Sequence, residues 1–334
     1  MKIGVYGAGM IVNDFLSMYK QVEGLELAYI CATPGEEEKL KELCTKYDIP
    51  KYYLDAEEAM NDETETVYLG VPNHVHYPMA KKALLLGKNV ICEKPFTSNY
   101  TEAQELAELA RSKGLILVEA VSTHYMPNME AIKEMIPTLG DVKLIMMNFS
   151  KYSSRYGAFK SGMTLPAFDP AKSGGALMDI NIYNLNFIVG LFGEPESIQY
   201  YPNIEKGIDT SGILILDYKN FKAVLLGAKD CEAPLAVSIE GDKRFITMDN
   251  PVNLFTSFRI TDVVGYGKKH EIDDVINRND PDKHRMYYEF VEFQRMIEEK
   301  DLKAADKALD RTLSVMKLAT KARLEAGVVF TADK

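Results

Sequence analysis

Short apolar runs and amphipathic stretches alternate along the first 120 residues of the chain. Apolar runs of about 4–8 residues bounded by turn residues are typical of buried strands, and apolar residues spaced three and four apart are typical of helices. We expect strands at 2–6, 25–31, 51–54, 66–71, 90–93 and 115–119. We expect helices after Gly9 and at 36–47, 56–60, 77–86 and 102–112. This alternation predicts a parallel sheet with right-handed crossovers.

From Lys143 onward the pattern changes to β-rich segments without crossover helices between them. These segments lie at 143–152, 196–201, 210–218, 221–227, 234–240, 244–248 and 258–264. Turn residues separate several of them, which predicts an antiparallel sheet. A helix led by two glycines is inserted near 173–184, and helices at 282–299 and 304–326 close the chain.

The two patterns predict an α/β protein of two domains. Residues 1–120 form a doubly wound parallel sheet, and residues 121–334 form an α+β domain with a large, mostly antiparallel open sheet. We expect the C-terminal helix to pack back on the first domain. The expected helices leave one face of the open sheet uncovered, and large exposed apolar faces mark interfaces. We therefore expect a homodimer, or a dimer of dimers, through that sheet.

Composition narrows the range of partners. The 334 residues are 46% apolar and 26% charged, as in a globular protein with a substantial core. The net charge of −10 argues against nucleic acid or an anionic membrane surface as the main partner. We see no signal peptide and no apolar stretch near the roughly 20 residues of a membrane helix. The scattered cysteines (Cys31, Cys44, Cys92 and Cys231) indicate buried thiols in a reducing cytoplasm, with no disulfide and no metal site.

A glycine motif follows the first expected strand directly. Gly7-Ala8-Gly9-Met10-Ile11 leads into a helical pattern, which is the context that a dinucleotide-binding fingerprint requires. The first glycine allows the tight turn, and the second lets the backbone approach a pyrophosphate at the helix N-terminus. Val12 stands where the fingerprint has a third glycine or alanine. The motif predicts that NAD or NADP binds here.

The end of the second strand bears on the choice between these cofactors. An acidic residue there binds the adenosine ribose of NAD, but this chain has Ala32 and Thr33. The absence of the carboxylate leaves room for a 2′-phosphate, with the Thr33 hydroxyl as a donor, and so favours NADP slightly. The glutamates at 36–38 open the next helix, where they favour its dipole.

Polar residues also follow the later strands, at the edge where parallel sheets bind ligands. Val71, Pro72, Asn73 and His76 follow the fourth strand, and Glu93-Lys94 follows the fifth, just before Pro95. Charged residues are seldom buried unless they are paired, so Lys94 at this edge is a candidate proton carrier. A plain surface salt bridge is the alternative. His76 is a candidate cofactor contact, and its side chain is either a structural cap at the start of its helix or an acid–base group.

In the second domain, Asp179 and Tyr183 lie four residues apart on the Gly-led helix and therefore share a face. They are either site residues or an ordinary polar pair on an amphipathic helix. His124 and Tyr125 are tentative substrate contacts, with a strand-end hydrogen bond as the alternative for His124. Arg155 is either a substrate contact or a surface arginine. His74, His270 and His284 are expected to be solvated or capping residues.

The whole set of motifs resembles the glucose–fructose oxidoreductase / inositol dehydrogenase / MocA family. The motifs are Gly7-Ala8-Gly9, Val71-Pro72-Asn73 with His76, Gly87-Lys88-Asn89-Val90, Cys92-Glu93-Lys94-Pro95, and Gly174-Gly175-Ala176-Leu177-Met178-Asp179 with Tyr183. The tyrosine at 183 is similar to the dimeric dihydrodiol/xylose dehydrogenase branch, as is Glu119-Ala120-Val121. The stretch Ser122-Thr123-His124-Tyr125 departs from that branch, which usually has an aromatic residue and an arginine there. The resemblance also implies a cis peptide bond before Pro95.

The resemblance implies an NAD(P)-dependent oxidoreductase that transfers a hydride to or from a sugar, polyol or vicinal diol. Such a reaction needs a group that takes or gives the hydroxyl proton. Lys94 fits this role if burial and the nicotinamide cation lower its pKa, with Tyr183 as a relay and Asp179 orienting hydroxyls or Lys94 itself. A cofactor-binding regulator without turnover is the alternative function, and a tightly held cofactor recycled between two sugars is a third.

Overall fold

The computed structural model describes residues 1–265, 267–268 and 275–334, and His270 lies outside these ranges. The chain divides into two compact units. Unit 1 comprises Met1–Ser122 and Met286–Met316, and unit 2 comprises Thr123–Arg285 and Lys317–Lys334.

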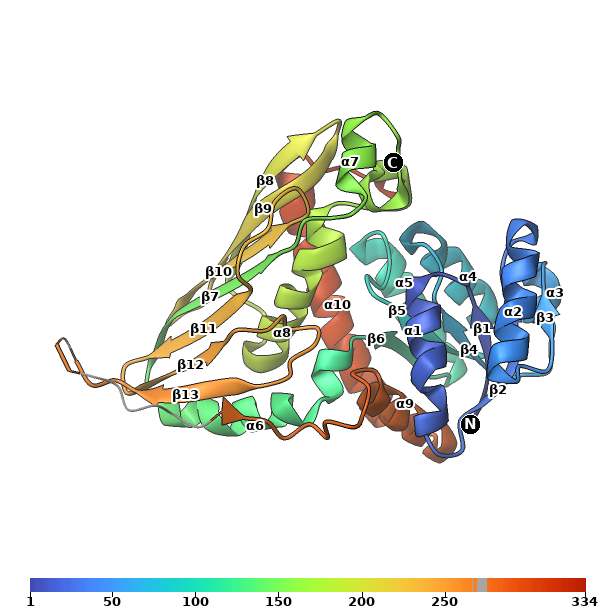
Figure 1. The fold of residues 1–334 in the computed structure, drawn as a ribbon, viewed down its shortest axis with the longest axis horizontal. Coiled ribbons are helices and arrows are strands. Elements are labelled where there is room, and N and C mark those ends of the chain that lie inside the picture. Colours follow the sequence, from blue (N-terminus) through green and yellow to red (C-terminus); the bar gives the residue numbers. More distant parts are fainter. Residues whose placement is uncertain (266, 269–274) are drawn as a thin grey trace. The chain divides into compact units, whose positions relative to one another are not determined.

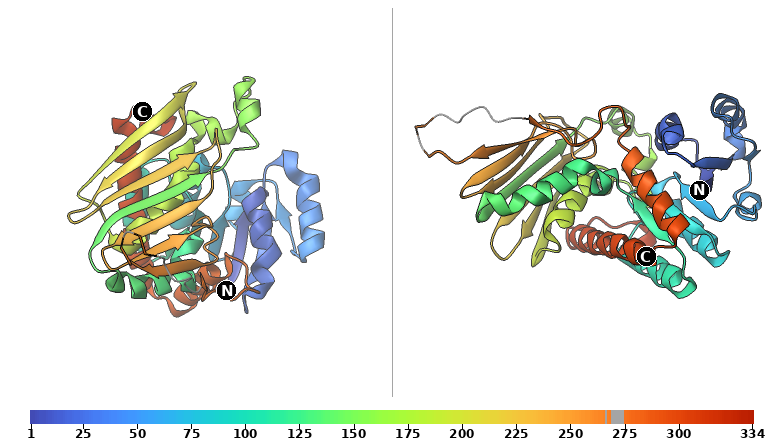
Figure 2. Two further views of the ribbon diagram at one scale, coloured as in Figure 1. Left: turned by 60° about the vertical axis from the view of Figure 1, so that its left-hand side comes forward. Right: turned by 90° about the horizontal axis from the view of Figure 1, so that it is seen from below.

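Unit 1 contains a six-stranded parallel sheet with the order β3-β2-β1-β4-β5-β6, and helices lie on both faces of it (Figures 1 and 2). The strands are β1 (Lys2–Tyr6), β2 (Glu26–Cys31), β3 (Tyr52–Tyr53), β4 (Thr66–Leu69), β5 (Asn89–Glu93) and β6 (Leu117–Ala120). The helices are α1 (Met10–Met18), α2 (Glu37–Tyr47), α3 (Ala56–Met60), α4 (Asn73–Leu85), α5 (Tyr100–Lys113), α9 (Tyr287–Glu299) and the first part of α10 (Leu302–Glu325). The strand order reverses between β1 and β4, so ligands are expected to bind at the carboxyl ends of these strands.

Unit 2 contains an eight-stranded sheet with the order β14-β13-β12-β11-β7-β10-β9-β8 among the described residues. The strands are β7 (Val142–Ser150), β8 (Ser197–Glu205), β9 (Ile208–Asp217), β10 (Lys222–Ala228), β11 (Ala236–Gly241), β12 (Arg244–Met248), β13 (Phe258–Asp262) and β14 (Val275–Ile276). The helices are α6 (Pro127–Met135), α7 (Tyr156–Lys160) and α8 (Ile182–Phe192), with the π-helical turn η7 (Leu177–Asn181) directly before α8. Figure 1 shows α8 along one face of the sheet. The expected fold class is confirmed.

Several sequence-based expectations need correction. Helix α4 begins at Asn73 and not at Tyr77, because Pro72 takes the N-cap position and Pro78 lies on the exposed side, where water can replace the missing amide. Strands β7 and β10 pair in parallel, whereas antiparallel pairing was expected. Helix α6 and strand β14 were not expected. Cys231 is exposed, because it lies just after β10 outside the core.

One segment among the described residues is long and apolar enough to cross a membrane by length and composition, which corrects the expectation that none would be. It is Pro170–Phe192, and 67% of its apolar window is buried inside the protein. Buried core helices can have the same length and apolar composition, so this segment is weak evidence for a membrane span.

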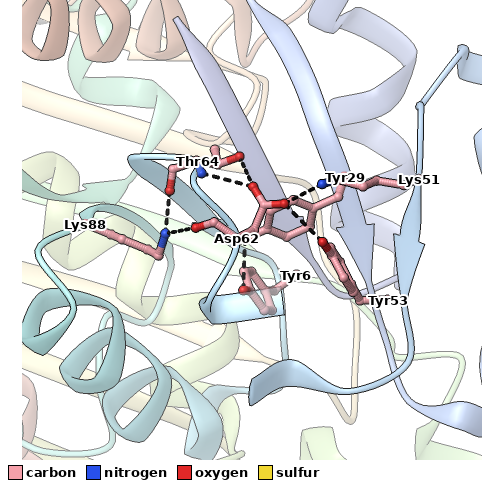
Figure 3. Close-up of polar contacts among 7 residues, drawn as sticks. All are labelled: Tyr6, Tyr29, Lys51, Tyr53, Asp62, Thr64 and Lys88. Atoms are coloured by element: carbon pink, nitrogen blue, oxygen red, sulfur yellow. Dashed lines mark hydrogen bonds and ion pairs between the residues drawn. The ribbon is translucent and has the colours of Figure 1, made fainter. Parts of the chain in front are cut away.

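The amino-terminal side of the sheet in unit 1 is held by a buried polar cluster (Figure 3). The Lys88 ammonium, 7% exposed, donates to the carbonyl oxygens of Asp62 and Thr64, each at 2.6 Å. The Asp62 carboxylate accepts from the Thr64 backbone, the Lys51 ammonium and the Tyr53 hydroxyl. Burial acts to raise the pKa of Asp62, but these hydrogen bonds hold it well below its ordinary value. Lys88 thus ties the connection before β4 to the start of β5.

The Tyr29 ring, which lies against β1, explains the glycine within that strand. An added Cβ at Gly4 would lie 2.1 Å from the ring of Tyr29, which crosses β1 from the neighbouring strand. The Tyr29 hydroxyl lies 3.0 Å from the Tyr6 hydroxyl, as Figure 3 shows. A side chain at Gly4 would therefore push Tyr29 out of the core.

Candidate active site

The turn after β1 is shaped by two glycines that face each other. Gly7 has φ +107°, and an added Cβ would lie 2.3 Å from the carbonyl oxygen of Gly70, at the end of β4. The bulky Val12 is fully buried here, since Gly70 lacks the Cβ that would come within 2.5 Å of its methyl group. Gly70 therefore compensates for the valine at the third position of the fingerprint.

The N-terminus of α1 has the features of an anion site. Gly9 is the exposed N-cap residue, and no side chain caps the first turn, which also contains no acidic residue. An added Cβ at Gly9 would meet no neighbouring atom, so this glycine is not required by internal packing. Ala8 is buried, Ile11 is half-buried and Met10 is 77% exposed. The uncapped amides and the helix dipole fit the pyrophosphate of a dinucleotide.

The end of β2 differs from the expectation in one respect. Ala32 is half-buried and Thr33 is exposed, but the Thr33 hydroxyl already donates to the carboxylate of Glu36 at 3.0 Å. Glu36 ends a short 3₁₀ turn before α2, and it brings a negative charge to the strand end where we expected none. Thr33 is therefore not a ready donor to a 2′-phosphate.

His76 connects the ends of β4 and β5. Its ring is buried, with Nδ1 2.9 Å from the carbonyl oxygen of Pro95 and Nε2 2.9 Å from that of Val71. Burial lowers the pKa of His76. Pro72 is exposed and Asn73 is half-buried at the start of α4. The ring thus holds the backbone of the Lys94–Pro95 turn. Both ring nitrogens contact carbonyl oxygens, so the ring does not cap the amides at the start of α4, as the structural alternative supposed.

Lys94 lies directly after β5, half-buried, and its peptide bond to Pro95 is cis, as the resemblance implied. The buried carboxylate of Glu93 accepts a 2.8 Å bond from the Tyr68 hydroxyl on β4 and a 3.3 Å bond from the Lys94 amide. Glu93 therefore anchors the end of β5 to β4. This anchor fixes the backbone from which the Lys94 side chain extends.

Glu119 holds the other side of the same turn. Its carboxylate, 4% exposed on β6, accepts from the Phe96 amide at 3.1 Å and from the Thr312 hydroxyl at 2.9 Å. Burial raises the pKa of Glu119 to about 7, although both hydrogen bonds act to lower it. His76 therefore contacts the Pro95 carbonyl and Glu119 contacts the Phe96 amide, so the backbone is held at two successive residues.

The raised pKa of Glu119 predicts a pH-dependent stability. Between the ordinary value of 4.5 and about 7, the folded chain binds more protons than the unfolded chain. The free energy of unfolding therefore falls as pH rises through this window, by about 3 kcal/mol in total. We expect Glu119→Gln to remove this contribution, measured by urea unfolding at about pH 5 and about pH 8. An exposed control, Glu108→Gln, should keep the wild-type dependence, and an unchanged profile in Glu119→Gln would contradict the assignment.

In unit 2, Gly174 and Gly175 allow the turn that carries Asp179. An added Cβ at Gly175, which has φ +102°, would lie 2.0 Å from the buried carboxylate of Asp209. Asp209 accepts a 2.7 Å bond from the Leu177 amide and so caps the start of η7. Burial raises the pKa of Asp209 to about 6, against this hydrogen bond. Gly175 therefore makes room for the carboxylate that holds the turn, whereas an added Cβ at Gly174 would lie 2.5 Å from the Pro166 carbonyl oxygen.

The Asp179 carboxylate is paired with a buried lysine that the sequence analysis did not single out. Lys229, directly after β10, is 1% exposed, and its ammonium lies 2.6 Å from the Asp179 carboxylate. The ammonium also donates to the Ala167 carbonyl at 2.6 Å and lies 4.3 Å from the ring centroid of Phe168. Tyr183, on α8, is half-buried. Asp179 and Tyr183 come from a π-helical turn and the α-helix that continues it, a feature frequent at functional sites.

The remaining substrate candidates are His124, Tyr125 and Arg155. His124 is buried against α8, where its Nε2 hydrogen donates to the Asn186 side-chain oxygen at 3.1 Å. An added Cβ at Gly190 would lie 2.7 Å from the His124 ring, so this histidine is packed as a structural residue. Tyr125 is half-buried, and Arg155 is exposed at the start of α7.

The sequence analysis did not single out several residues that position the candidate side chains or make room for them. Lys229 ends an apolar run, as Lys94 does, and the same signal could have found it. Tyr68 and Gly70 lie within or just after an apolar strand, so nothing in the pattern separates them from core residues. Among the described residues, no group of three or more His, Cys, Asp or Glu side chains could hold a metal ion.

Known proteins are similar to this chain over both of its domains. Residues 1–121 match an oxidoreductase family with an NAD-binding Rossmann fold, and residues 129–247 match the GFO/IDH/MocA C-terminal domain. The chain is 31% identical over 336 residues to scyllo-inositol 2-dehydrogenase (NADP⁺) of Bacillus subtilis strain 168, covering 100% of this chain and 99% of that protein. It is 33% identical over 224 residues to the trans-1,2-dihydrobenzene-1,2-diol dehydrogenase of Bos taurus, covering 65% of this chain and 64% of that protein.

Two solved structures share the fold. A 3-ketoreductase from Actinomadura kijaniata, in complex with NADP and TDP-benzene, superposes with a TM-score of 0.83 at 16% identity over 97% of each chain. A levoglucosan dehydrogenase in complex with NADH and levoglucosan gives a TM-score of 0.79 at 14% identity, covering 98% of this chain and 97% of that one. The present chain matches the family models over both domains and the Bacillus subtilis relative over its full length. It therefore belongs to the Gfo/Idh/MocA family and is an NAD(P)-dependent oxidoreductase that acts on CH–OH groups.

Proposed function

We propose that this protein transfers a hydride between NAD(P) and a hydroxyl or carbonyl carbon of a sugar, polyol or vicinal diol, with Lys94 as the proton donor and acceptor. The observation that carries the proposal is the placement of Lys94. It follows β5 at the carboxyl edge of the parallel sheet, the same edge at which the uncapped N-terminus of α1 follows β1. A proton carrier and an anion-binding helix end at one edge suit a dinucleotide-dependent reaction.

The chain's own residues would hold the cofactor and move the proton. The backbone at Gly7, Gly9 and the first turn of α1 would bind the pyrophosphate, while Val71 and Asn73 would line the nicotinamide side. When bound, the nicotinamide supplies or accepts the hydride. In alcohol oxidation, the neutral amine of Lys94 takes the hydroxyl proton as the carbonyl forms. In reduction, the ammonium returns that proton to the oxygen.

The substrate side of the proposal rests on Asp179 and Tyr183. Asp179 is 38% exposed despite its ion pair, so its carboxylate can still accept a hydrogen bond from a substrate hydroxyl. Tyr183 would relay or supply the proton alongside Lys94. Both residues come from one continuous helical segment, which gives them a fixed spacing.

We propose NADP as the preferred dinucleotide, with NAD as the second choice. Two facts support NADP: no acid occupies position 32 or 33, and the relative from Bacillus subtilis is named as NADP-dependent. Glu36 acts in the opposite direction, because its carboxylate at Thr33 repels a 2′-phosphate. We therefore expect the preference to be modest.

The proposal is tested by a spectrophotometric screen of sugars, polyols and vicinal diols with each dinucleotide, following the absorbance of the reduced nicotinamide. We expect turnover with at least one polyhydroxylated substrate, with a higher kcat/KM for NADP than for NAD. Dinucleotide binding without turnover across the whole screen would instead favour the regulator of the same fold. Nucleotide that co-purifies with the protein would indicate a cofactor recycled within one site.

The open face of the sheet in unit 2 supports a proposal about assembly. Exposed apolar side chains lie on three strands of this face: Leu144, Met146, Tyr201, Ile213 and Ile215. The register aligns Met146 and Ile215 on either side of Val224, and sets Ile213 opposite Tyr201. Figure 2, left, shows the strands of this sheet in front of the helices. We propose that a second copy of the chain covers this face. We also propose that the protein acts in the cytoplasm.

Light scattering at micromolar concentration tests the assembly. We expect a mass of at least twice 37.6 kDa for the wild type. Ile215→Glu should shift the mass towards the monomer, because a carboxylate would be buried without a partner in the interface. Val291→Glu, at an exposed position of α9, is the control and should leave the mass unchanged. A monomeric wild type would contradict the proposal.

A further inference from the structure

The ammonium of Lys229 cannot serve as a substrate contact, because the side chain is 1% exposed. Its interactions in unit 2 include the ion pair with Asp179, the bond to the Ala167 carbonyl, and the cation–π contact with Phe168. Burying an ammonium is costly unless it is paired and hydrogen-bonded. A lysine kept at this position against that cost calls for an explanation beyond packing.

The partner of Lys229 supplies that explanation. Asp179 is the partly exposed member of the pair, at 38%, and it lies in the π-helical turn η7. A carboxylate side chain can adopt several rotamers, and a fixed ion-pair partner favours the one that keeps the contact. The buried ammonium holds one carboxylate oxygen at 2.6 Å and so selects one orientation.

The strand end that carries Lys229 is itself fixed. The Lys229 amide donates to the Thr210 carbonyl at 2.9 Å, and its carbonyl accepts from the Ser153 amide at 2.9 Å. The next residue, Asp230, accepts hydrogen bonds from the hydroxyls of Thr210 and Ser211 at 2.7 and 2.9 Å. Lys229 therefore extends from a rigid support at the end of β10.

We propose that Lys229 is a positioning residue, which fixes the Asp179 carboxylate as a hydrogen-bond acceptor for a substrate hydroxyl. This inference rests on the proposed function. It adds that the buried ammonium of Lys229 selects the orientation in which Asp179 accepts this hydrogen bond. The pairing also makes the two residues one functional element.

The test is a double-mutant cycle on the full-length protein, with the polyol that the wild type turns over. We expect Lys229→Met to lower kcat/KM by about 10²-fold, mainly through KM, because misplacing a contact by about 1 Å costs that much. The dissociation constant for the dinucleotide should stay unchanged. In an Asp179→Asn background, Lys229→Met should cause little further loss, since its effect passes through Asp179.

Two further variants and two outcomes separate the possible failures. Lys229→Gln, which keeps amide donors towards Ala167 and Asp179, should unfold near the wild-type temperature if Lys229→Met does not fold. Lys222→Met, at the start of β10, removes an exposed ion pair with Asp217 at the end of β9 and should leave kcat/KM unchanged. Additive losses in the cycle, with an active wild type, would overturn the role of Lys229 alone. A wild type without turnover on any polyol would overturn the proposed function and this inference together.

Discussion

Lys94→Met is expected to lower kcat by about 10³-fold, because a positioned proton donor or acceptor contributes on the order of 10²–10⁴ to the rate. The substitution keeps the length of the side chain and removes the group that exchanges the proton. The end of β5 should keep its structure, since Glu93, His76 and Glu119 bond to the backbone of this turn. The measurement is steady-state kinetics on the substrate found in the screen.

Binding and folding must be shown to survive for this result to carry weight. The dissociation constant for NAD(P), measured by quenching of reduced-nicotinamide fluorescence, should change less than about tenfold, or 1.4 kcal/mol. Lys81→Met, on α4, removes the ion pair of Lys81 with Glu105 on α5; it is the matched control and should retain wild-type kcat. A Lys94→Met protein with wild-type kcat would remove Lys94 from the mechanism.

Lys88→Met is expected to cost about 3 kcal/mol of unfolding free energy, the largest stability effect that we expect in unit 1. Its ammonium satisfies the carbonyl oxygens of Asp62 and Thr64, and each buried acceptor left without a donor costs about 1–3 kcal/mol. Removing the buried charge offsets part of this cost. In a thermal melt, the loss corresponds to a fall in Tm of about 9 °C.

Lys82, a lysine at the surface of α4, provides the control. Lys82 pairs with Glu57 at the surface, and Lys82→Met should change stability by less than about 1 kcal/mol. The Lys88→Met protein should still bind NAD(P), because its cluster lies before the strands and the cofactor residues follow them. A melting temperature equal to that of the wild type would show that the two carbonyls find other donors.

The parallel sheet of unit 1 could be predicted almost residue by residue, since its strands are buried on both faces and appear as continuous apolar runs. Strand β1 was expected at 2–6 and lies at Lys2–Tyr6, and β4 was expected at 66–71 and lies at Thr66–Leu69. The parallel pairing of β7 with β10 could not be predicted. Strand direction depends on which segments meet across the sheet, and the alternation within a strand is the same for either direction.

The candidate site also contains some residues that the sequence pattern indicates and others that it does not. Gly7, Lys94 and Asp179 could be found, because a glycine or a charge at the end of an apolar run stands out from the pattern. Their supports could not: Gly70 matters only because Val12 packs against it, and Glu119 only because the Phe96 amide lies opposite. The Thr33–Glu36 bond changed the expected role of Thr33, since a three-residue turn brings the two side chains together.

The central claim is that Lys94 exchanges a proton with the substrate oxygen while Asp179 and Tyr183 contact the same molecule. A crystal structure of the protein with NAD(P) and the polyol from the screen tests it most directly. We expect the Lys94 amine within about 3.2 Å of the hydroxyl whose carbon faces the nicotinamide, with the Asp179 carboxylate accepting from a neighbouring hydroxyl. A substrate bound away from the Lys94 amine, with another side chain on the reacting oxygen, would contradict the account.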